Sequence, residues 1–287
     1  MTEIWMFPGQ GSQRVGMGAG RWDAAPKLVA AADAVLGYSV RDLCEHGPRE
    51  RLDDTRYAQP ALYVVGAVAW RAALDAAAPP PDVLCGHSLG EYNALECAGA
   101  MEFTDGLRLV LRRAEAMAVV TGGGMLAVRG LGWDGLRPLL DPVRHRDVSL
   151  AVVNGPRQLV LGGPGPQLRD LAGELTASGL CRVLPLRVSG AFHTRLMDAA
   201  AREFASAAAG LPWADPAVPV LSNVTARPHD RQRLPELLVR HLTHPVLWHD
   251  TLRELHGMPA PHFREIGGGT ALTGMVRAAR PASAPRS

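Results

Sequence analysis

The stretch "PDVLCGHSLGEYNALECAGA", residues 81–100, places one serine between two glycines, after a short apolar run and before a segment with helical spacing. A strand, a Gly-x-Ser-x-Gly turn and a helix form a nucleophile elbow, in which a tight turn exposes the serine hydroxyl. Gly86 and Gly90 lack Cβ atoms, so the strand and the helix can approach closely. The pattern predicts that Ser88 is a nucleophile, although the same short pattern also arises by chance in glycine-rich turns.

An activated serine needs two further kinds of group, a base within hydrogen-bond reach and donors for the developing oxyanion. Backbone N–H groups at the start of the helix, that of Leu89 above all, can supply such donors. Among the ten histidines, His193 in "VSGAFHTRLM" follows the last strand of a predicted insert, where the chain can reach back to Ser88. His193 is therefore the candidate base; the alternative is a capping or surface histidine.

The composition limits the classes of protein that fit. The chain has 287 residues, of which 47% are hydrophobic and 20% charged, enough for one large α/β domain with or without a smaller insert. The formal net charge is +2 and the arginines are scattered, so we expect no nucleic-acid partner. Four cysteines without a Cys-x-x-Cys pair favour reduced thiols. With no signal-like N-terminus and no long apolar run, we expect a cytoplasmic protein that does not contact membranes.

The order of patterns along the chain indicates an α/β protein with an insertion. The apolar run at 3–7, stopped by Pro8-Gly9, predicts a buried strand, and residues 60–78 predict a buried helix opened by Pro60. A further strand is predicted at 218–224.

Residues 122–189 have a different pattern of apolar and polar residues. The pattern predicts a strand, strand, helix and strand, which form a small α+β domain. We therefore expect a catalytic domain made of residues 1–121 and 190–280, an inserted domain at 122–189, and a disordered tail at 281–287.

Seven short motifs occur together along the chain: "FPGQGSQ" (7–13), "GHSLGEY" (86–92), Arg113 with Met117, "GAFH" (190–193), "SNVTA" (222–226), "HPVLW" (244–248) and "EIGGG" (265–269). In this order they resemble one family, the malonyl-CoA:acyl-carrier-protein transacylases, and within it the stand-alone acyltransferases that serve polyketide synthases in trans. The resemblance covers nearly the whole chain. The resemblance implies an α/β-hydrolase-like large domain with a ferredoxin-like insert.

The resemblance also implies a role for each site residue. Ser88 would carry the acyl group as an ester, with His193 as base and then acid. The backbone N–H groups of Gln10 and Leu89 would form the oxyanion hole. Arg113 would bind the free carboxylate of malonyl with its planar fork; as an alternative, Arg113 lies with Arg112 on a solvated helix face.

Further residues are implied to contact the substrate: Met117, His87, Phe192 and His241. Phe192 would narrow the pocket beside the malonyl Cα, which favours malonyl over methylmalonyl.

Two positions depart from the family pattern. His241 stands where the "QLxxPVxW" motif usually has Gln, and Ala114 stands where Gly usually follows the Arg. The backbone carbonyl of residue 241, which the family uses to hold the catalytic histidine, is present with any side chain. The changed side chain would alter the pocket wall and could admit a hydroxyl- or amino-substituted malonyl. The spacing of His241 and His244 also fits a metal site, but Pro245 and the lack of a nearby third ligand leave no metal expected.

Together these features predict an acyltransferase that works by a ping-pong mechanism. Malonyl would pass from malonyl-CoA to Ser88 and then to the phosphopantetheine thiol of an acyl carrier protein. We expect no bound cofactor and a monomer. The alternatives are an unusual malonyl-type extender unit, an acyl hydrolase that clears wrongly loaded carrier proteins, and a non-catalytic docking module for carrier proteins.

Overall fold

Strand β1 (Thr2–Phe7) lies inside a parallel sheet, and its side chains from Ile4 to Phe7 are fully buried. Because successive side chains of a strand point to opposite faces, both faces of the sheet must be covered. The sheet has the order β7-β2-β1-β8, in which β1 pairs in parallel with β2 (Val83–Gly86) and β8 (Pro261–Glu265), and β2 with β7 (Val220–Leu221). The computed structural model describes residues 1–279, so the predicted tail at 281–287 lies outside the described residues.

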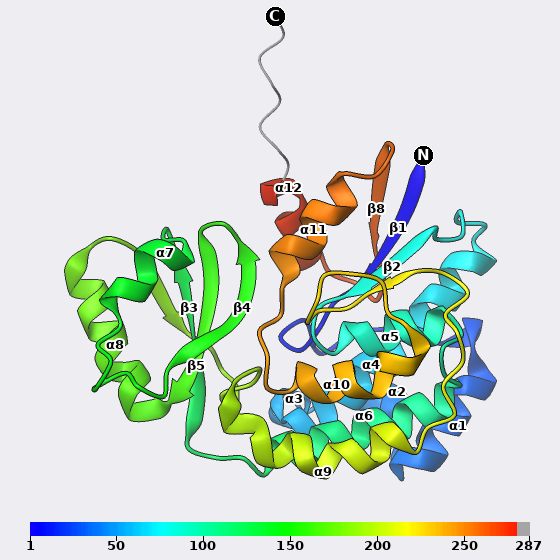
Figure 1. Ribbon diagram of the computed structural model, residues 1–287. Helices are drawn as coiled ribbons and strands as arrows, with labels where there is room; N and C mark the ends of the chain where they lie inside the picture. Colours follow the sequence, from blue (N-terminus) through cyan, green and yellow to red (C-terminus); the bar gives the residue numbers. More distant parts are fainter. Residues whose placement is uncertain (280–287) are drawn as a thin grey trace, which may run out of the picture.

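Helices pack around this sheet and form the larger lobe of the molecule (Figure 1). The helices of this lobe are α1 (Pro26–Leu36), α2 (Val40–His46), α3 (Arg49–Asp53), α4 (Thr55–Asp75), α5 (Gly90–Cys97), α6 (Phe103–Ala118), α9 (Asp198–Ala209), α10 (Leu234–His241), α11 (Trp248–His256) and α12 (Ala271–Ala279). No helix within residues 1–279 is both long enough and apolar enough to cross a bilayer.

Helix α4 begins earlier than the sequence predicts. Pro60 was expected at its first turn, but the helix starts at Thr55 and Pro60 lies inside it. The side chain of Asp54 accepts a hydrogen bond from the backbone N–H of Arg56 at 2.9 Å and so caps the true start.

The smaller lobe has its own antiparallel sheet and its own core (Figure 1). Its strands have the order β4-β5-β3-β6, and in chain order the lobe reads strand, helix, strand, strand, helix, strand, which is the ferredoxin-like arrangement. Its elements are β3 (Gly123–Arg129), α7 (Trp133–Leu136), β4 (Ser149–Gly155), β5 (Gln158–Pro164), α8 (Gly165–Ser178) and β6 (Arg182–Pro185).

The predicted fold class is confirmed: the chain is an α/β protein with a parallel sheet and a smaller ferredoxin-like domain. Two details differ from the expectation. The second of the strands expected within 122–189 is the hairpin of β4 and β5, and the strand expected at 218–224 is only β7. After β7 the backbone leaves the sheet because Ser222 and Asn223 bond to other groups, as described below.

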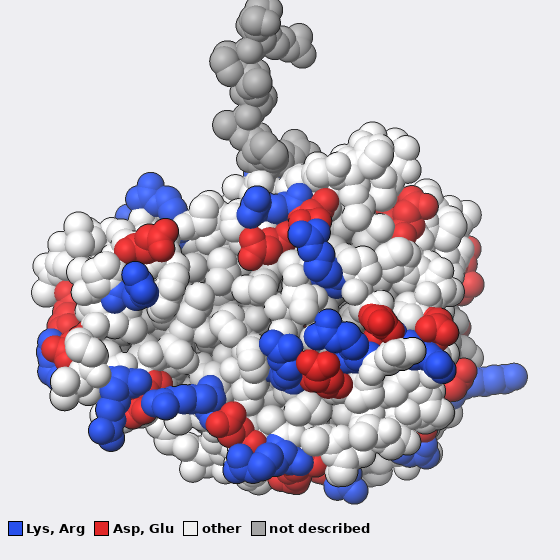
Figure 2. All heavy atoms as spheres, in the orientation of Figure 1, with Lys and Arg blue, Asp and Glu red and all other residues white. Residues whose placement is uncertain are grey.

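The surface around the junction of the two lobes carries no single sign of charge. In Figure 2, Lys and Arg side chains are interspersed with Asp and Glu over this face, and mostly uncharged atoms cover the area between the lobes. The loops that follow β1 and β2 meet there, at the carboxyl ends of these parallel strands. Ligands of open α/β sheets bind at such ends, so this junction is where a site is expected.

Candidate active site

Ser88 lies on a tight turn between β2 and α5. The turn is flanked by Gly86 and Gly90, and neither position has room for a Cβ atom. A Cβ atom at Gly86 would lie 1.9 Å from the carbonyl carbon of Gly90, and one at Gly90 would lie 2.0 Å from the carbonyl oxygen of Phe7. Ser88 itself has φ +50°, the left-handed region that non-glycine residues seldom adopt. The strain is local and lies at the predicted nucleophile.

One asparagine holds this turn from both sides. Asn223 accepts the backbone N–H of Ser88 through Oδ1 at 2.7 Å and donates from Nδ2 to the carbonyl oxygen of Gly86 at 2.6 Å. The buried carboxylate of Glu91 accepts the backbone N–H of Asn223 at 3.1 Å. Neither residue was predicted as part of the site. The signal for Asn223 was its place in the "SNVTA" motif.

Ser88 and His193 form a hydrogen-bonded pair. The Oγ of Ser88 lies 2.8 Å from Nε2 of His193, and Nδ1 of His193 lies 2.7 Å from the carbonyl oxygen of His241. A carbonyl oxygen can only accept, so Nδ1 carries the proton and Nε2 is free to take the proton of Ser88. Burial of His193, together with the positive charge of Arg113, lowers the pKa of the imidazole to about 3. His193 is therefore neutral at pH 7, the form that a general base requires.

The loop after β1 lies directly against the elbow. A Cβ atom at Gly9 would lie 2.2 Å from the carbonyl oxygen of His87 and 3.5 Å from the backbone nitrogen of Leu89. Within the described part of the chain, the N–H groups of Gln10 and Leu89 donate to no protein acceptor. The side chain of Gln10 is engaged elsewhere and donates to Oγ1 of Thr55 at 3.0 Å. Both backbone donors are thus free for an oxyanion.

Arg113 is a buried cation that forms no ion pair within residues 1–279. Its side chain on α6 is 1% exposed, and burial lowers its pKa. Nη1 donates to Oε1 of Gln59 at 2.6 Å and Nη2 donates to Oγ of Ser88 at 3.2 Å, whereas Nε has no partner. No carboxylate within residues 1–279 forms an ion pair with it, while the neighbouring Arg112 is exposed and pairs with Glu115. A buried charge requires a partner, and here a ligand carboxylate could supply it.

A cavity of about 410 Å³ opens at Ser88 between the two lobes. His87 connects the lobes, because its Nε2 lies 2.9 Å from Oδ1 of Asn154 on β4. The larger lobe contributes Gln10, His87, Ser88, Arg113, Met117, Phe192 and His193, and the smaller lobe contributes Met125, Arg129, Val152, Asn154 and Val160.

His241 does not line this cavity, although we expected its side chain in the pocket wall. Its ring is fully buried behind His193 and stacks on it, with the ring centroids 4.9 Å apart and the planes 27° from parallel. The position follows from the backbone, since the carbonyl of residue 241 must reach Nδ1 of His193. The other departure, Ala114, is buried within α6, which continues through it without a break.

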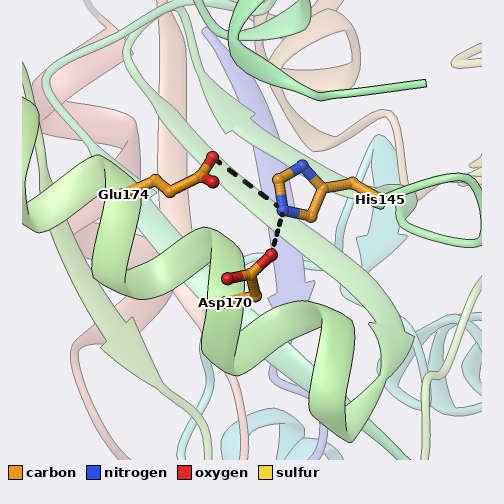
Figure 3. A group of neighbouring side chains, drawn as sticks. All are labelled: His145, Asp170 and Glu174. Atoms are coloured by element: carbon orange, nitrogen blue, oxygen red, sulfur yellow. Dashed lines mark ion pairs between the residues drawn. The ribbon is translucent and has the colours of Figure 1, made fainter. Parts of the chain in front are cut away.

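One group of side chains elsewhere has the composition of a metal site. His145, Asp170 and Glu174 lie together in the smaller lobe (Figure 3). Nδ1 of His145 accepts the backbone N–H of Asp141 at 3.0 Å, and Nε2 lies 3.4 Å from Oδ2 of Asp170. Arg144 also pairs with both carboxylates. We therefore interpret the group as an ion-pair cluster that fastens the loop before β4 to α8.

Comparison with known proteins agrees with this geometry. The model of the acyl transferase domain family matches residues 4–266. The polyketide biosynthesis malonyl CoA-acyl carrier protein transacylase PksC of Bacillus subtilis is 40% identical over 273 residues, which cover 95% of each chain. The crystal structure of malonyl CoA-acyl carrier protein transacylase from Burkholderia pseudomallei has a TM-score of 0.94 and 41% identity, covering 98% of this chain and 100% of that one.

A second solved structure contains a partner. It is described as a type II PKS acyl-carrier protein in complex with its malonyl-transacylase, and it matches with a TM-score of 0.92 and 33% identity over 96% of this chain and 92% of that one. The resemblance predicted from the motifs is thus confirmed over nearly the whole length. Because both the sequence and the arrangement of the two lobes are shared, this protein belongs to the acyl transferase domain family.

Proposed function

We propose that this protein transfers malonyl from malonyl-CoA to the phosphopantetheine thiol of an acyl carrier protein through an ester on Ser88. The observation that carries the proposal is the position of Arg113, a buried guanidinium that has no ion pair within residues 1–279 and lies 3.2 Å from the Oγ of Ser88. When malonyl is esterified to this oxygen, a single methylene group separates its ester carbonyl carbon from its free carboxylate. The carboxylate can therefore reach Arg113 and form the missing pair.

In the first half of the reaction, the Oγ of Ser88 attacks the thioester carbonyl carbon and its proton moves to Nε2 of His193. The oxyanion of the tetrahedral intermediate is held by the N–H groups of Gln10 and Leu89. When the carbon–sulfur bond breaks, Nε2 returns the proton to the leaving thiolate. Coenzyme A departs as the thiol, and malonyl remains on Ser88 as an ester.

The second half reverses these roles with a different thiol. The phosphopantetheine thiol gives its proton to Nε2 of His193 and attacks the ester carbonyl carbon. Ser88 leaves with the proton from Nε2, and malonyl remains on the carrier protein as a thioester. The relative solved with a carrier protein supports this class of partner. The same site needs no bound cofactor, since CoA and phosphopantetheine belong to the substrates.

Phe192 and the position of His241 bear on the choice of acyl group. Phe192 lines the cavity with its side chain 5% exposed, and we propose that it limits the space beside the malonyl Cα. His241 lies outside the cavity wall, so it gives no reason to favour a polar substituent there. An acyl hydrolase that clears neutral acyl groups would have no use for Arg113.

The proposal also covers the domain boundaries, the oligomeric state and the pathway of this protein. We propose that the cleft separates a catalytic domain, residues 1–121 with 190–280, from the inserted domain at 122–189, and that a monomer suffices because one chain supplies every group named above. We also propose a role in polyketide biosynthesis, as the printed name of the Bacillus subtilis relative suggests.

Intact-protein mass spectrometry after mixing with malonyl-CoA tests the central claim. The native protein should gain one malonyl group per chain, and Ser88→Ala should gain none. His193→Ala should load at a rate lower by about 100-fold or more, the range for loss of a positioned base. A malonyl adduct on Ser88→Ala would refute the assignment of the nucleophile. Loss of the adduct to water as fast as to a carrier protein would favour the hydrolase.

A further inference from the structure

His241 is a buried imidazole whose two ring nitrogens form no hydrogen bond within residues 1–279. Buried polar side chains nearly always have a partner, so this exception requires an explanation. The backbone carbonyl of His241 already holds His193, and any side chain would provide that carbonyl. The ring must therefore be explained by what it contacts.

The ring lies between the catalytic base and a buried carboxylate. On one side it stacks on His193, with ring centroids 4.9 Å apart. On the other side its Nδ1 is 3.4 Å from Oε2 of Glu91, close but not aligned for a hydrogen bond. Glu91 is fixed, since its Oε1 lies 2.6 Å from Nε2 of His229 and its Oε2 accepts the backbone N–H of Asn223. A hydrogen bond from Nδ1 to Oε2 therefore requires a change in the orientation of the His241 ring.

Burial favours a neutral His241, and the positive charge of Arg113 acts in the same direction. The titratable and charged groups that face it are His193, Arg113, His87, His229 and Glu91. Burial lowers the pKa of His241 well below its usual range, and the neighbouring His193 and Arg113 lower it further. A neutral ring can donate from Nδ1 to Glu91 and still present its π face to His193.

We propose that His241 is a positioning residue whose neutral ring, hydrogen-bonded to Glu91, stabilises the positive charge on His193 when that residue takes a proton. His193 has no carboxylate of its own; the carbonyl of His241 is the acceptor at its Nδ1. A π face stacked on a cation attracts it, and a hydrogen bond to a carboxylate adds electron density to the ring. The proton of Ser88 goes no further than Nε2 of His193, and His241 stays neutral throughout.

The substitution His241→Gln tests this, since it removes the ring but keeps the backbone carbonyl. Single-turnover acylation by malonyl-CoA should slow by about 5- to 30-fold, the range for losing a buried cation–π contact, with KM nearly unchanged. His244→Gln is the matched control. His244 lies three residues after His241, and its ring bonds to the backbone carbonyl of Arg240. The acylation rate of this control should stay within about twofold of the native rate. Equal rates for native protein and His241→Gln would overturn the proposal.

A second measurement uses the native protein and so does not depend on how a variant folds. A phosphonate that bonds to the Oγ of Ser88 gives a tetrahedral adduct in which His193 carries both protons. NMR of ¹⁵N-labelled histidine should then find His241 neutral, with its proton on Nδ1 and bonded to Glu91. In this adduct the pKa of His193 should be about one unit lower in His241→Gln than in the native protein. One pKa unit is a tenfold change in the protonation equilibrium, which lies within the range expected for the acylation rate.

A proton on Nε2 of His241, or an unchanged pKa of His193 in the variant, would overturn the inference. The inference rests on the proposed function only for the role of His193 as base. The two proposals fail through different results. Failure of the proposed function would appear as a malonyl adduct on Ser88→Ala. Failure of this inference would appear in the protonated nitrogen of His241 or in the pKa of His193 in His241→Gln.

Discussion

The substitution Arg113→Ala should separate recognition of the malonyl carboxylate from the chemistry of acyl transfer. In the structure Arg113 is 1% exposed and forms no ion pair with any described residue. A malonyl carboxylate that enters this cleft loses its hydration, and Arg113 is the cation placed to offset the loss. Removing one member of a buried charge pair typically costs 2–5 kcal/mol or more, so malonyl should lose at least ~2 kcal/mol of transition-state binding, or roughly 30-fold in kcat/KM.

Acetyl-CoA provides the comparison within the same variant. Its acyl group has no carboxylate, so Arg113→Ala should leave acetyl loading nearly unchanged or raise it, because an unpaired cation no longer faces the methyl group. The quantity to measure is the ratio of the kcat/KM values for the two thioesters. Arg112→Ala is the matched control: its side chain is 70% exposed and its pair with Glu115 is of the kind that contributes little.

The reasoning fails if Arg113→Ala lowers loading of both thioesters by the same factor. Arg113 would then support Ser88 through the 3.2 Å contact of Nη2 with Oγ rather than bind the substrate. Arg113→Lys adds a further check, since it keeps the charge but loses the bidentate fork. It should restore only part of the preference for malonyl.

Three other changes have expected outcomes. Competition between malonyl-CoA and methylmalonyl-CoA should favour malonyl in the native protein. Phe192→Ser should raise methylmalonyl loading by roughly 10-fold or more, the range for one methyl group in a pocket. An unchanged ratio of methylmalonyl to malonyl loading would count against a clash at Phe192. The pKa of His193 is about 3 in the folded chain against 6.5 as a reference value, so the unfolded state binds the additional proton in this window and stability should fall as the pH drops from 6.5 to 3. Chemical denaturation of His193→Ala should show a weaker pH dependence over that window, and an equal slope would contradict the assigned pKa. Gly90→Ala should prevent the elbow from forming, since its Cβ would lie 2.0 Å from the carbonyl oxygen of Phe7; normal acyl loading by this variant would show that the turn can relax.

Local sequence patterns were enough for the elbow but not for the groups that hold it. The apolar run before Gly86 and the helical spacing after Gly90 predicted the turn, since it depends on neighbours in the chain, and the role of Ser88 as nucleophile stays a prediction. Asn223 lies 135 residues from Ser88, and nothing in its local sequence shows that both ends of its amide bond the elbow. The helix start at Thr55 was missed because Pro60 also fits the first turn of a helix, although Asp54 is an equally favoured N-cap residue.

The two proposed catalytic residues both have strained backbones, and the rest of the fold must offset the free-energy cost of that strain. Ser88 has φ +50° and His193 has φ +61°, and each such non-glycine residue costs of order 1–3 kcal/mol. Asn223 holds the first through two hydrogen bonds, and the carbonyl of His241 holds the ring of the second. Both supports come from the last third of the chain, after the inserted lobe. The elbow is therefore encoded near residue 88, but its geometry is completed only when residues 223–241 have packed against it, so a chain that ends before β7 would contain both proposed catalytic residues without the contacts that hold them in place.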